Sequence, residues 1–180
     1  MVSIFDTFIF YNKLKVYIKL PNVMIQKETG TMSATLEVAI FLSMNGKAKE
    51  AIDFYKKHFN AEELLLVTYE DMAKRDSSMQ LTDENKHYVT HSVLSIGKTK
   101  VMLAEDPMDA TEKYVVGNNT SLCIQSADLE EIEHFYKSLT TDDRVRIIVP
   151  LSGNVFSKAY GIIEDPFGIQ IQLMYDDRLK

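Results

Sequence analysis

Cysteine is nearly absent from this chain of 180 residues, which contains a single one, Cys123. One cysteine excludes a disulfide within the chain and a metal centre built from several cysteines. Chains without disulfides are typical of reducing compartments, so we expect a cytoplasmic protein.

A basic excess is also missing. The net charge is −6, and the isoelectric point is about 5.2. Surfaces that bind nucleic acid usually carry a basic excess or a basic stripe, so we expect no nucleic-acid partner. The chain is 46% hydrophobic and 26% charged, which is typical of a globular protein with a substantial core.

Long apolar runs are missing as well. The aromatic opening stretch "IFDTFIFYNKLK" is interrupted by Asp6, Asn12 and Lys13, so no run reaches the roughly 18 residues of a membrane span. Its lysines follow the apolar part, whereas a signal peptide carries its positive charge before that part. We therefore expect no membrane partner.

Residues 1–35 form an N-terminal extension that the regular pattern of the rest does not include. Lys27 and Glu28 can be encoded by a sequence that resembles a bacterial ribosome-binding site, just upstream of Met32. This leads to the hypothesis that translation naturally starts at Met32, in which case most of the extension is not native.

What the chain does contain is a repeat. The stretch "AIDFYKKHF" at 51–59 returns in altered form as "IEHFYKSL" at 132–139. In the first copy, apolar residues at helical spacing predict one buried helix face. This face comprises Ala48, Ala51, Ile52, Tyr55 and Phe59. In the second copy, Asp128 is the expected N-cap of the helix.

Strand patterns follow each helix in the same order. Short apolar or alternating runs predict strands in both halves. The expected strands are 36–43, 62–71, 87–97 and 98–106 in the first half, and 120–125, 144–152, 158–165 and 168–175 in the second. Each half therefore reads β-α-β-β-β, which makes the two helices equivalent parts of two copies of one module.

The expected fold class is α+β, with two βαβββ modules at 36–105 and 119–180 and a polar linker at 106–118. Two helices cannot cover both faces of eight strands. We therefore expect a curved, mostly antiparallel eight-stranded sheet, with helices on one face and a cavity on the other, where small-molecule sites often lie.

The motifs "NGKAKEAIDFYKKHF", "HSVLSIGKTKVMLAED" and "YGIIEDPFGIQIQL", in this order, resemble the vicinal-oxygen-chelate superfamily of glyoxalase, bleomycin-resistance and extradiol-dioxygenase proteins. Within it, the chain is most similar to the PhnB-like branch, over residues 36–176. The resemblance implies the paired-module fold and a cavity that binds a small molecule.

Metal-dependent members of this superfamily hold a divalent ion at four cavity positions. The resemblance places these near Ala39, Leu103, Asn119 and Gln172. Alanine and leucine have no donor atom, and amide oxygens are weak ligands where a transition metal prefers imidazole or carboxylate. We therefore expect no metal and no other cofactor.

The expected cavity wall follows from strand alternation together with this resemblance. Leu94 and Ile96 suit packing on a helix, so His91 and Ser95 should face the cavity, with Tyr160 as the counterpart of His91 in the second half. The predicted ligand-binding residues are Phe41, His91, Ser95, Leu103, Asn119, Cys123, Tyr160 and Gln172.

For several residues the structural interpretation is favoured over a chemical one. His58 and His134 lie on the helices and are expected to face solvent. Glu105 and Glu164 lie near strand ends, where acidic side chains are usually solvated. Cys123 is expected to be a small apolar side chain and not a nucleophile, since no histidine is adjacent in the sequence.

PhnB-like proteins often carry a methyltransferase label. A methyl-donor nucleotide site normally has a glycine-rich turn after its first parallel strand, and no G-x-G motif occurs among the seven glycines. We expect a metal-free small-molecule-binding protein and not a methyltransferase. The alternatives are a metal-dependent lyase, isomerase or dioxygenase, and a structural or regulatory dimer without a ligand.

A homodimer is expected in either case. Two modules leave uncovered strand edges, which invite pairing with a neighbour. In the family that the chain resembles, a second copy commonly closes the half-open cavity. Twofold association is also the commonest form of soluble oligomer.

Overall fold

The computed structural model describes residues 18–20, 23–25, 36–105 and 113–180. The chain divides into two compact units, residues 1–38 and 39–180. The hypothesis on Met32, most of the N-terminal extension and residues 106–112 of the expected linker lie outside the described residues. In the first unit, the strands β1 (Ile18–Leu20) and β2 (Val23–Ile25) pair antiparallel.

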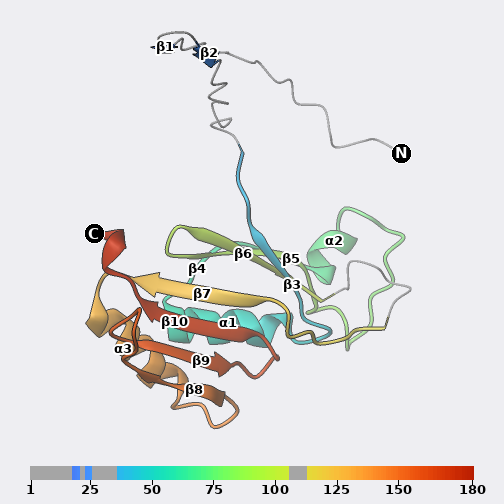
Figure 1. Ribbon diagram of the computed structural model, residues 1–180. Coiled ribbons are helices and arrows are strands. Elements are labelled where there is room, and N and C mark those ends of the chain that lie inside the picture. The colour runs from blue at the N-terminus through green and yellow to red at the C-terminus, as the bar shows by residue number, and fades with distance from the viewer. Residues whose placement is uncertain (1–17, 21–22, 26–35, 106–112) are drawn as a thin grey trace. The chain divides into compact units, whose positions relative to one another are not determined.

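The first module lies in the second unit (Figure 1). Its strands form one four-stranded sheet in the order β3-β6-β5-β4, in which only the β3–β6 pair is parallel. The elements are β3 (Ile40–Ser43), α1 (Ala48–Phe59), β4 (Glu62–Thr68), α2 (Tyr69–Ala73), β5 (Val89–Ile96) and β6 (Thr99–Ala104).

The second module has the same topology. Its sheet runs β7-β10-β9-β8, and only the β7–β10 pair is parallel. Its elements are β7 (Ser121–Ser126), α3 (Leu129–Leu139), β8 (Arg146–Ser152), β9 (Tyr160–Glu164) and β10 (Gln170–Tyr175), followed by the 3₁₀ turn η1 (Asp177–Leu179).

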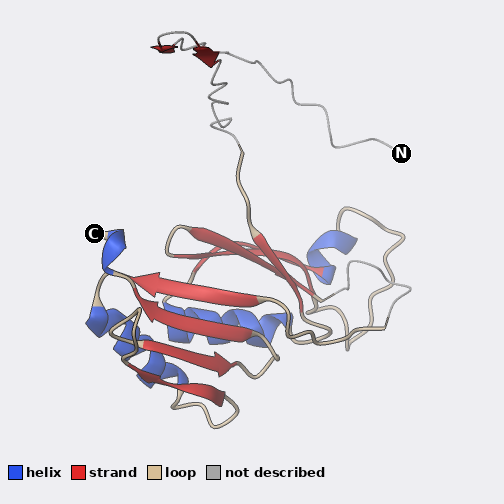
Figure 2. Cartoon of the chain, viewed as in Figure 1, coloured by secondary structure: helices blue, strands red, loops and turns tan. Residues whose placement is uncertain are grey.

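The predicted α+β fold with two βαβββ modules is confirmed. Both Phe-Tyr pairs, Phe54-Tyr55 and Phe135-Tyr136, lie in helices at equivalent positions of the repeat. The strands of the two modules form two groups (Figure 2), and each module has its own mixed sheet with two antiparallel pairs out of three. Among the described strands, hydrogen bonding does not continue from one four-stranded sheet into the other, so two four-stranded sheets stand in place of the expected single eight-stranded sheet.

The core occupies the helix side of each sheet. Leu94 and Leu103 from the first sheet, and Ile171 and Leu173 from the second, are fully buried. Helix α1 supplies the face that its sequence predicts, since Ala48, Ala51, Ile52, Tyr55 and Phe59 are all buried. The periodicity of the sequence therefore sets which side of each sheet stays open.

The start of α1 is capped from a distant part of the chain. Lys47, at the N-cap position, makes no side-chain cap. Instead Glu105, directly after β6, accepts hydrogen bonds from the backbone N–H of Ala48 at 3.0 Å and of Val89 at 3.4 Å. Glu105 is buried, so the expectation of a solvated carboxylate was wrong: its oxygens satisfy N–H groups that the fold leaves without partners.

Helix α1 also joins the two modules. Phe59 packs edge-on against Phe135 of α3, and Phe54 packs against Phe167, with ring centroids 5.6 and 5.7 Å apart. The Tyr55 hydroxyl donates a 2.6 Å hydrogen bond to Asp165, which lies in the turn between β9 and β10. Both helices of the repeat thus serve as packing elements between the modules.

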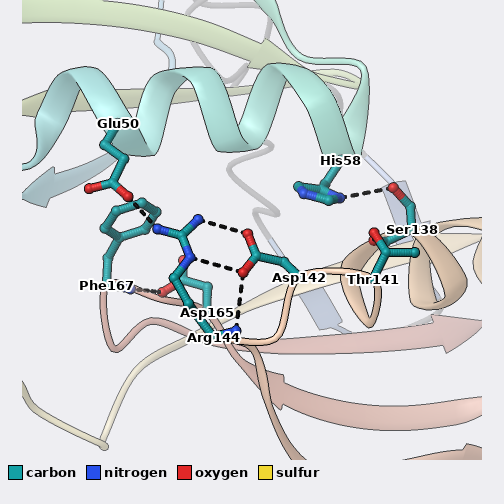
Figure 3. A network of polar contacts seen from close by, with 8 residues as sticks. All are labelled: Glu50, His58, Ser138, Thr141, Asp142, Arg144, Asp165 and Phe167. Atoms are coloured by element: carbon teal, nitrogen blue, oxygen red, sulfur yellow. Dashed lines mark hydrogen bonds and ion pairs between the residues drawn. The ribbon is translucent and has the colours of Figure 1, made fainter.

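A polar network borders this contact (Figure 3). Arg144 pairs with Asp142 at 2.7 Å and with Glu50 of α1. The Nδ1 of His58 lies 2.9 Å from the Ser138 hydroxyl of α3. His58 is only 2% exposed, so the expected solvent-facing role was wrong, because α3 covers this end of α1. His134 is exposed as expected.

One predicted strand ends early. Residues 69–71 were expected to continue the strand from 62, but β4 ends at Thr68 and α2 follows. Thr68 and Asp71 form a capping box: the Thr68 hydroxyl accepts from the Asp71 N–H, and the Asp71 carboxylate accepts from the Thr68 N–H. This reciprocal cap starts a helical turn.

None of the helices in the described part of the chain is long and apolar enough to cross a membrane.

Candidate ligand-binding faces

The side of each sheet that is opposite to the buried core carries the candidate site. We name these two surfaces the first open face and the second open face. The first open face comprises Phe41, His91, Val93, Ser95 and Met102. The second open face comprises Ser121, Cys123, Tyr160, Ile162, Gln172 and Met174.

Three of the predicted residues lie on the first open face. Along β5, His91 and Ser95 alternate with Ser92 and Leu94, which are fully buried on the helix side. Phe41, on β3, is 39% exposed, which is high for a phenylalanine in a strand. The Ser95 hydroxyl donates to the carbonyl of Gly97 in the adjoining turn, at 3.0 Å. This face is therefore apolar around Phe41 and carries the His91 imidazole, while Lys100 and Glu62, the cross-strand partners of Ser95, make its other end polar.

Leu103 does not share this face, and the prediction of a cavity-facing Leu103 was wrong. The register pairs Phe41 with Met102 and Leu42 with Leu103 across β3 and β6, so Leu103 points to the helix side. It is fully buried in the core. Met102 takes its place on the first open face, because a shift of one residue moves a side chain to the opposite side of a sheet.

Three predicted residues lie together on the second open face. Cys123 and Gln172 are direct partners across β7 and β10, and Tyr160 lies on the adjacent strand β9. The Tyr160 hydroxyl donates to Oε1 of Gln172 at 2.9 Å. Nε2 of Gln172 donates to the hydroxyl of Ser121 at 2.7 Å. We call Tyr160, Gln172 and Ser121 the polar triad.

Ser121 was not among the predicted residues. The predicted residue at this end of the strand, Asn119, lies in the loop before β7 and is exposed. Ser121 shares the alternation of Cys123, and that pattern was the signal that could have found it. Cys123 is exposed at the sheet edge, and partial burial raises the pKa of its thiol, which disfavours the thiolate needed for nucleophilic chemistry.

The residues present do not fit the divalent metal of the metal-dependent relatives. Of the four positions, Ala39, Leu103 and Asn119 offer no imidazole or carboxylate, and the Gln172 carbonyl already accepts from Tyr160. Within the described residues, no group of three or more His, Cys, Asp or Glu side chains is placed to hold a metal ion. Apart from Glu164, which is paired with Arg146, the second open face thus offers neutral hydrogen-bonding groups.

Two hollows lie next to these surfaces. One of about 760 Å³ adjoins the second open face, where Met174 and Phe156 line it together with the loop 153–158. Another of about 680 Å³ lies where the modules meet, and Cys123 reaches it. Both volumes fall in the range of ligand sites, which is about 300–1,000 Å³.

Comparison with known proteins points to one family. Residues 36–174 match the family described as 3-demethylubiquinone-9 3-methyltransferase. A search of curated proteins finds no match. Among solved structures, a Pseudomonas aeruginosa protein shares 18% identity with a TM-score of 0.65, and the alignment covers 79% of this chain and 98% of that one.

Two further structures are similar in fold. The Bacillus cereus PhnB protein, a putative 3-demethylubiquinone-9 3-methyltransferase, shares 23% identity with a TM-score of 0.59, over 78% of this chain and all of that one. The fosfomycin resistance protein FosX of Listeria monocytogenes shares 14% identity with a TM-score of 0.52, over 79% and 93%. At such identities the likeness extends to the fold alone.

Proposed function

Because the chain belongs to the PhnB-like, 3-demethylubiquinone-9 3-methyltransferase family of the vicinal-oxygen-chelate superfamily, we propose that it binds a small molecule on its open faces without a metal. The observation that supports this proposal is the chemistry of the side chains at the positions where a metal would be bound. At the four positions where the resemblance implies metal ligands, this chain has Ala39, Leu103, Asn119 and a glutamine, Gln172, that is engaged in hydrogen bonds.

The two faces would have different roles in such a site. The first open face offers apolar surface from Phe41, Val93 and Met102 beside the imidazole of His91. The second offers the neutral donors and acceptors of the polar triad. Apolar walls with a few placed polar groups are the usual composition of a ligand site.

The proposal excludes methyl transfer, in spite of the family's description. The turn between β3 and α1 contains a single glycine, Gly46. The strand β3, which begins the first module, belongs to a mixed sheet. A methyl donor that contains a nucleotide normally binds at a glycine-rich turn of an open parallel sheet. Neither feature is present in the described modules.

We further propose a cytoplasmic homodimer in which a second copy covers part of the open faces. Both sheets have uncovered edge strands, β3 and β4 in the first and β7 and β8 in the second. Leu65 of β4 and Val149 of β8 are more than one-third exposed. Apolar side chains at unpaired sheet edges favour association.

The test of the metal-free site is elemental analysis of protein purified without chelators. We expect substoichiometric metal. Stoichiometric zinc, nickel, iron or manganese would overturn the proposal and favour a metal-dependent lyase, isomerase or dioxygenase, with His91 as the first ligand to examine, since it is the imidazole on the first open face.

The test of ligand binding is a thermal-shift screen of diverse small molecules. A ligand at a hundred times its dissociation constant adds about 2.7 kcal/mol to the stability of the folded state. We expect at least one stabilising ligand whose effect is lost in Phe41→Lys or Gln172→Leu. A complete absence of hits would instead favour a structural dimer without a ligand.

A further inference from the structure

The polar triad has spare hydrogen-bonding capacity at one end. Tyr160 donates to Gln172, and Gln172 donates to Ser121, so the donors run in one direction along the triad. The Ser121 hydroxyl proton then remains to donate outward. With the Gln172 amide in the opposite orientation, the direction would reverse and the Tyr160 proton would remain. In both cases one hydroxyl donor is left for a ligand.

The surroundings of the polar triad are apolar. Cys123 and Ile162 are the direct cross-strand partners of Gln172, and Met174 is the partner of Tyr160. The ring of Phe156, which is 65% exposed, packs edge-on against Tyr160 with centroids 5.1 Å apart. Phe156 and Met174 also line the adjoining hollow of about 760 Å³, whose lining further includes the charged side chains of Lys158, Asp177 and Arg178. An apolar or aromatic body therefore fits beside the triad.

The electrostatics of this face disfavour a charged ligand. Carboxylates on and near this face are paired with arginines: Glu164 of β9 with Arg146 and Asp176 with Arg178, each at 2.7 Å. The three members of the triad are neutral side chains, which cannot offset the desolvation of an ion. A neutral molecule with an acceptor oxygen can replace the water on the free hydroxyl without leaving a charge unpaired.

From these observations we infer that the second open face recognises an uncharged, largely apolar molecule through one acceptor oxygen, such as a carbonyl, held by the polar triad beside Phe156. This inference rests on the proposed function, since it names the ligand class of the same site. In the place of a metal that binds ligand oxygens, the chain uses a directed series of hydrogen bonds, which polarise one another.

The experiment compares three probes of similar size by NMR titration of the ¹⁵N-labelled full chain. Acetophenone is neutral and carries a carbonyl, toluene lacks an acceptor, and benzoate is charged. We expect acetophenone to shift signals of β7, β9 and β10 and the side-chain amide signals of Gln172. Toluene and benzoate should each bind at least about tenfold more weakly than acetophenone. Toluene lacks the hydrogen bond, and benzoate adds a charge that must be desolvated.

Variants locate the effect. Gln172→Leu removes the centre of the polar triad and should weaken acetophenone binding about tenfold, whereas toluene binding should be unchanged. Gln170→Leu is the matched control: it is the same substitution, two residues earlier on the same side of β10, outside the triad. Ser121→Ala removes one hydroxyl with minimal change of shape, and serves if Gln172→Leu perturbs the fold.

The results separate this inference from the proposed function. Equal binding of acetophenone to the wild type, Gln172→Leu and Ser121→Ala would overturn the role of the triad, and so would tighter binding of benzoate. The general proposal would then still stand. No shift on this face with any probe would also overturn the inference, and the thermal-shift screen would decide separately whether another ligand binds.

Discussion

His58 is a buried titratable side chain in the contact between the two modules. The ring of His58 packs against Phe54 at a tilt, with ring centroids 4.5 Å apart, and its Nδ1 lies 2.9 Å from the Ser138 hydroxyl. Its Nε2 is buried and has no hydrogen-bond partner within the described residues. Burial lowers the pKa of His58, and Lys57 and Arg144 lower it further, while Asp142 and the Ser138 contact oppose this. Folding therefore favours the neutral form of this imidazole.

This burial predicts a pH dependence. The unfolded chain takes up a proton at His58 near pH 6.5, and the folded state does so only at lower pH. Unfolding therefore binds protons, and the free energy of unfolding should fall as pH drops below about 6.5. In His58→Gln, denaturation curves between pH 7 and 5.5 should show a shallower fall. His134→Gln, on the exposed side of α3, is the control, and equal slopes in all three proteins would contradict the prediction.

Tyr55 and Tyr136 occupy equivalent positions of the repeat but differ in their surroundings. Tyr55 is fully buried and donates to Asp165, whereas Tyr136 is partly exposed. Asp165 also accepts from the backbone N–H groups of Phe167 and Ile169. Burial raises the pKa of Asp165, while these three hydrogen bonds lower it and so support the charged form.

Tyr55→Phe should therefore cost about 1.5–3 kcal/mol, because it removes a hydrogen bond to a buried carboxylate. Tyr136→Phe should change stability by less than about 0.5 kcal/mol, as is usual for a substitution at the surface. Chemical denaturation of both variants measures the difference. Similar losses in the two variants would show that the bond to Asp165 contributes little.

Among the elements, α1 shows how a helix can depend on a distant residue for its cap. The sequence predicts the buried face of α1 well, because the 3.6-residue period is visible in "AKEAIDFYKKHF". It does not show the cap, because Glu105 is 57 residues from Ala48. Only the parallel pairing of β3 and β6 brings the end of β6 to the start of α1.

Glu105→Ala should destabilise the protein by about 1–3 kcal/mol, since it leaves two buried N–H groups without acceptors. Glu105→Gln should lose less, because one acceptor oxygen remains. Glu164→Gln breaks an ion pair at the surface and should cost at most about 1 kcal/mol. Thermal denaturation would rank the three variants. A loss in Glu164→Gln as large as that in Glu105→Ala would refute this ranking.

The sequence predicts which side chains face the core in some strands and not in others. In β5 the alternation of His91 and Ser95 with Leu94 is clear, and their placement followed from it. In β6 the run "VMLA" is apolar throughout, so nothing in the sequence tells which of Met102 and Leu103 faces the core. The error at Leu103 arose there. The burial of His58 likewise depends on α3, 80 residues away.

At the scale of the whole molecule, the repeat determines most of the architecture. Each module buries one side of its sheet against helices and leaves the other side with partly exposed apolar residues. The order of motifs was enough to predict two βαβββ modules. It was not enough to find the polar triad, because Ser121 comes together with Tyr160 and Gln172 only through the pairing of β7, β10 and β9.

The partly exposed faces also lead to the prediction of a dimer. Phe41, Leu65 and Val149 are between 37% and 43% exposed on open strands, and such positions are usually covered in a stable assembly. A specific twofold contact should bury at least about 1,000 Å² in total. Light scattering at micromolar concentration should therefore give about twice the chain mass of 20.6 kDa.

Phe41→Lys combined with Leu65→Lys should shift this mass towards the monomer, because charge at an edge or open face opposes pairing. Lys98→Ala, in the exposed turn between β5 and β6, is the control and should leave the mass unchanged. A mass near 20.6 kDa for the unmodified protein would refute the dimer.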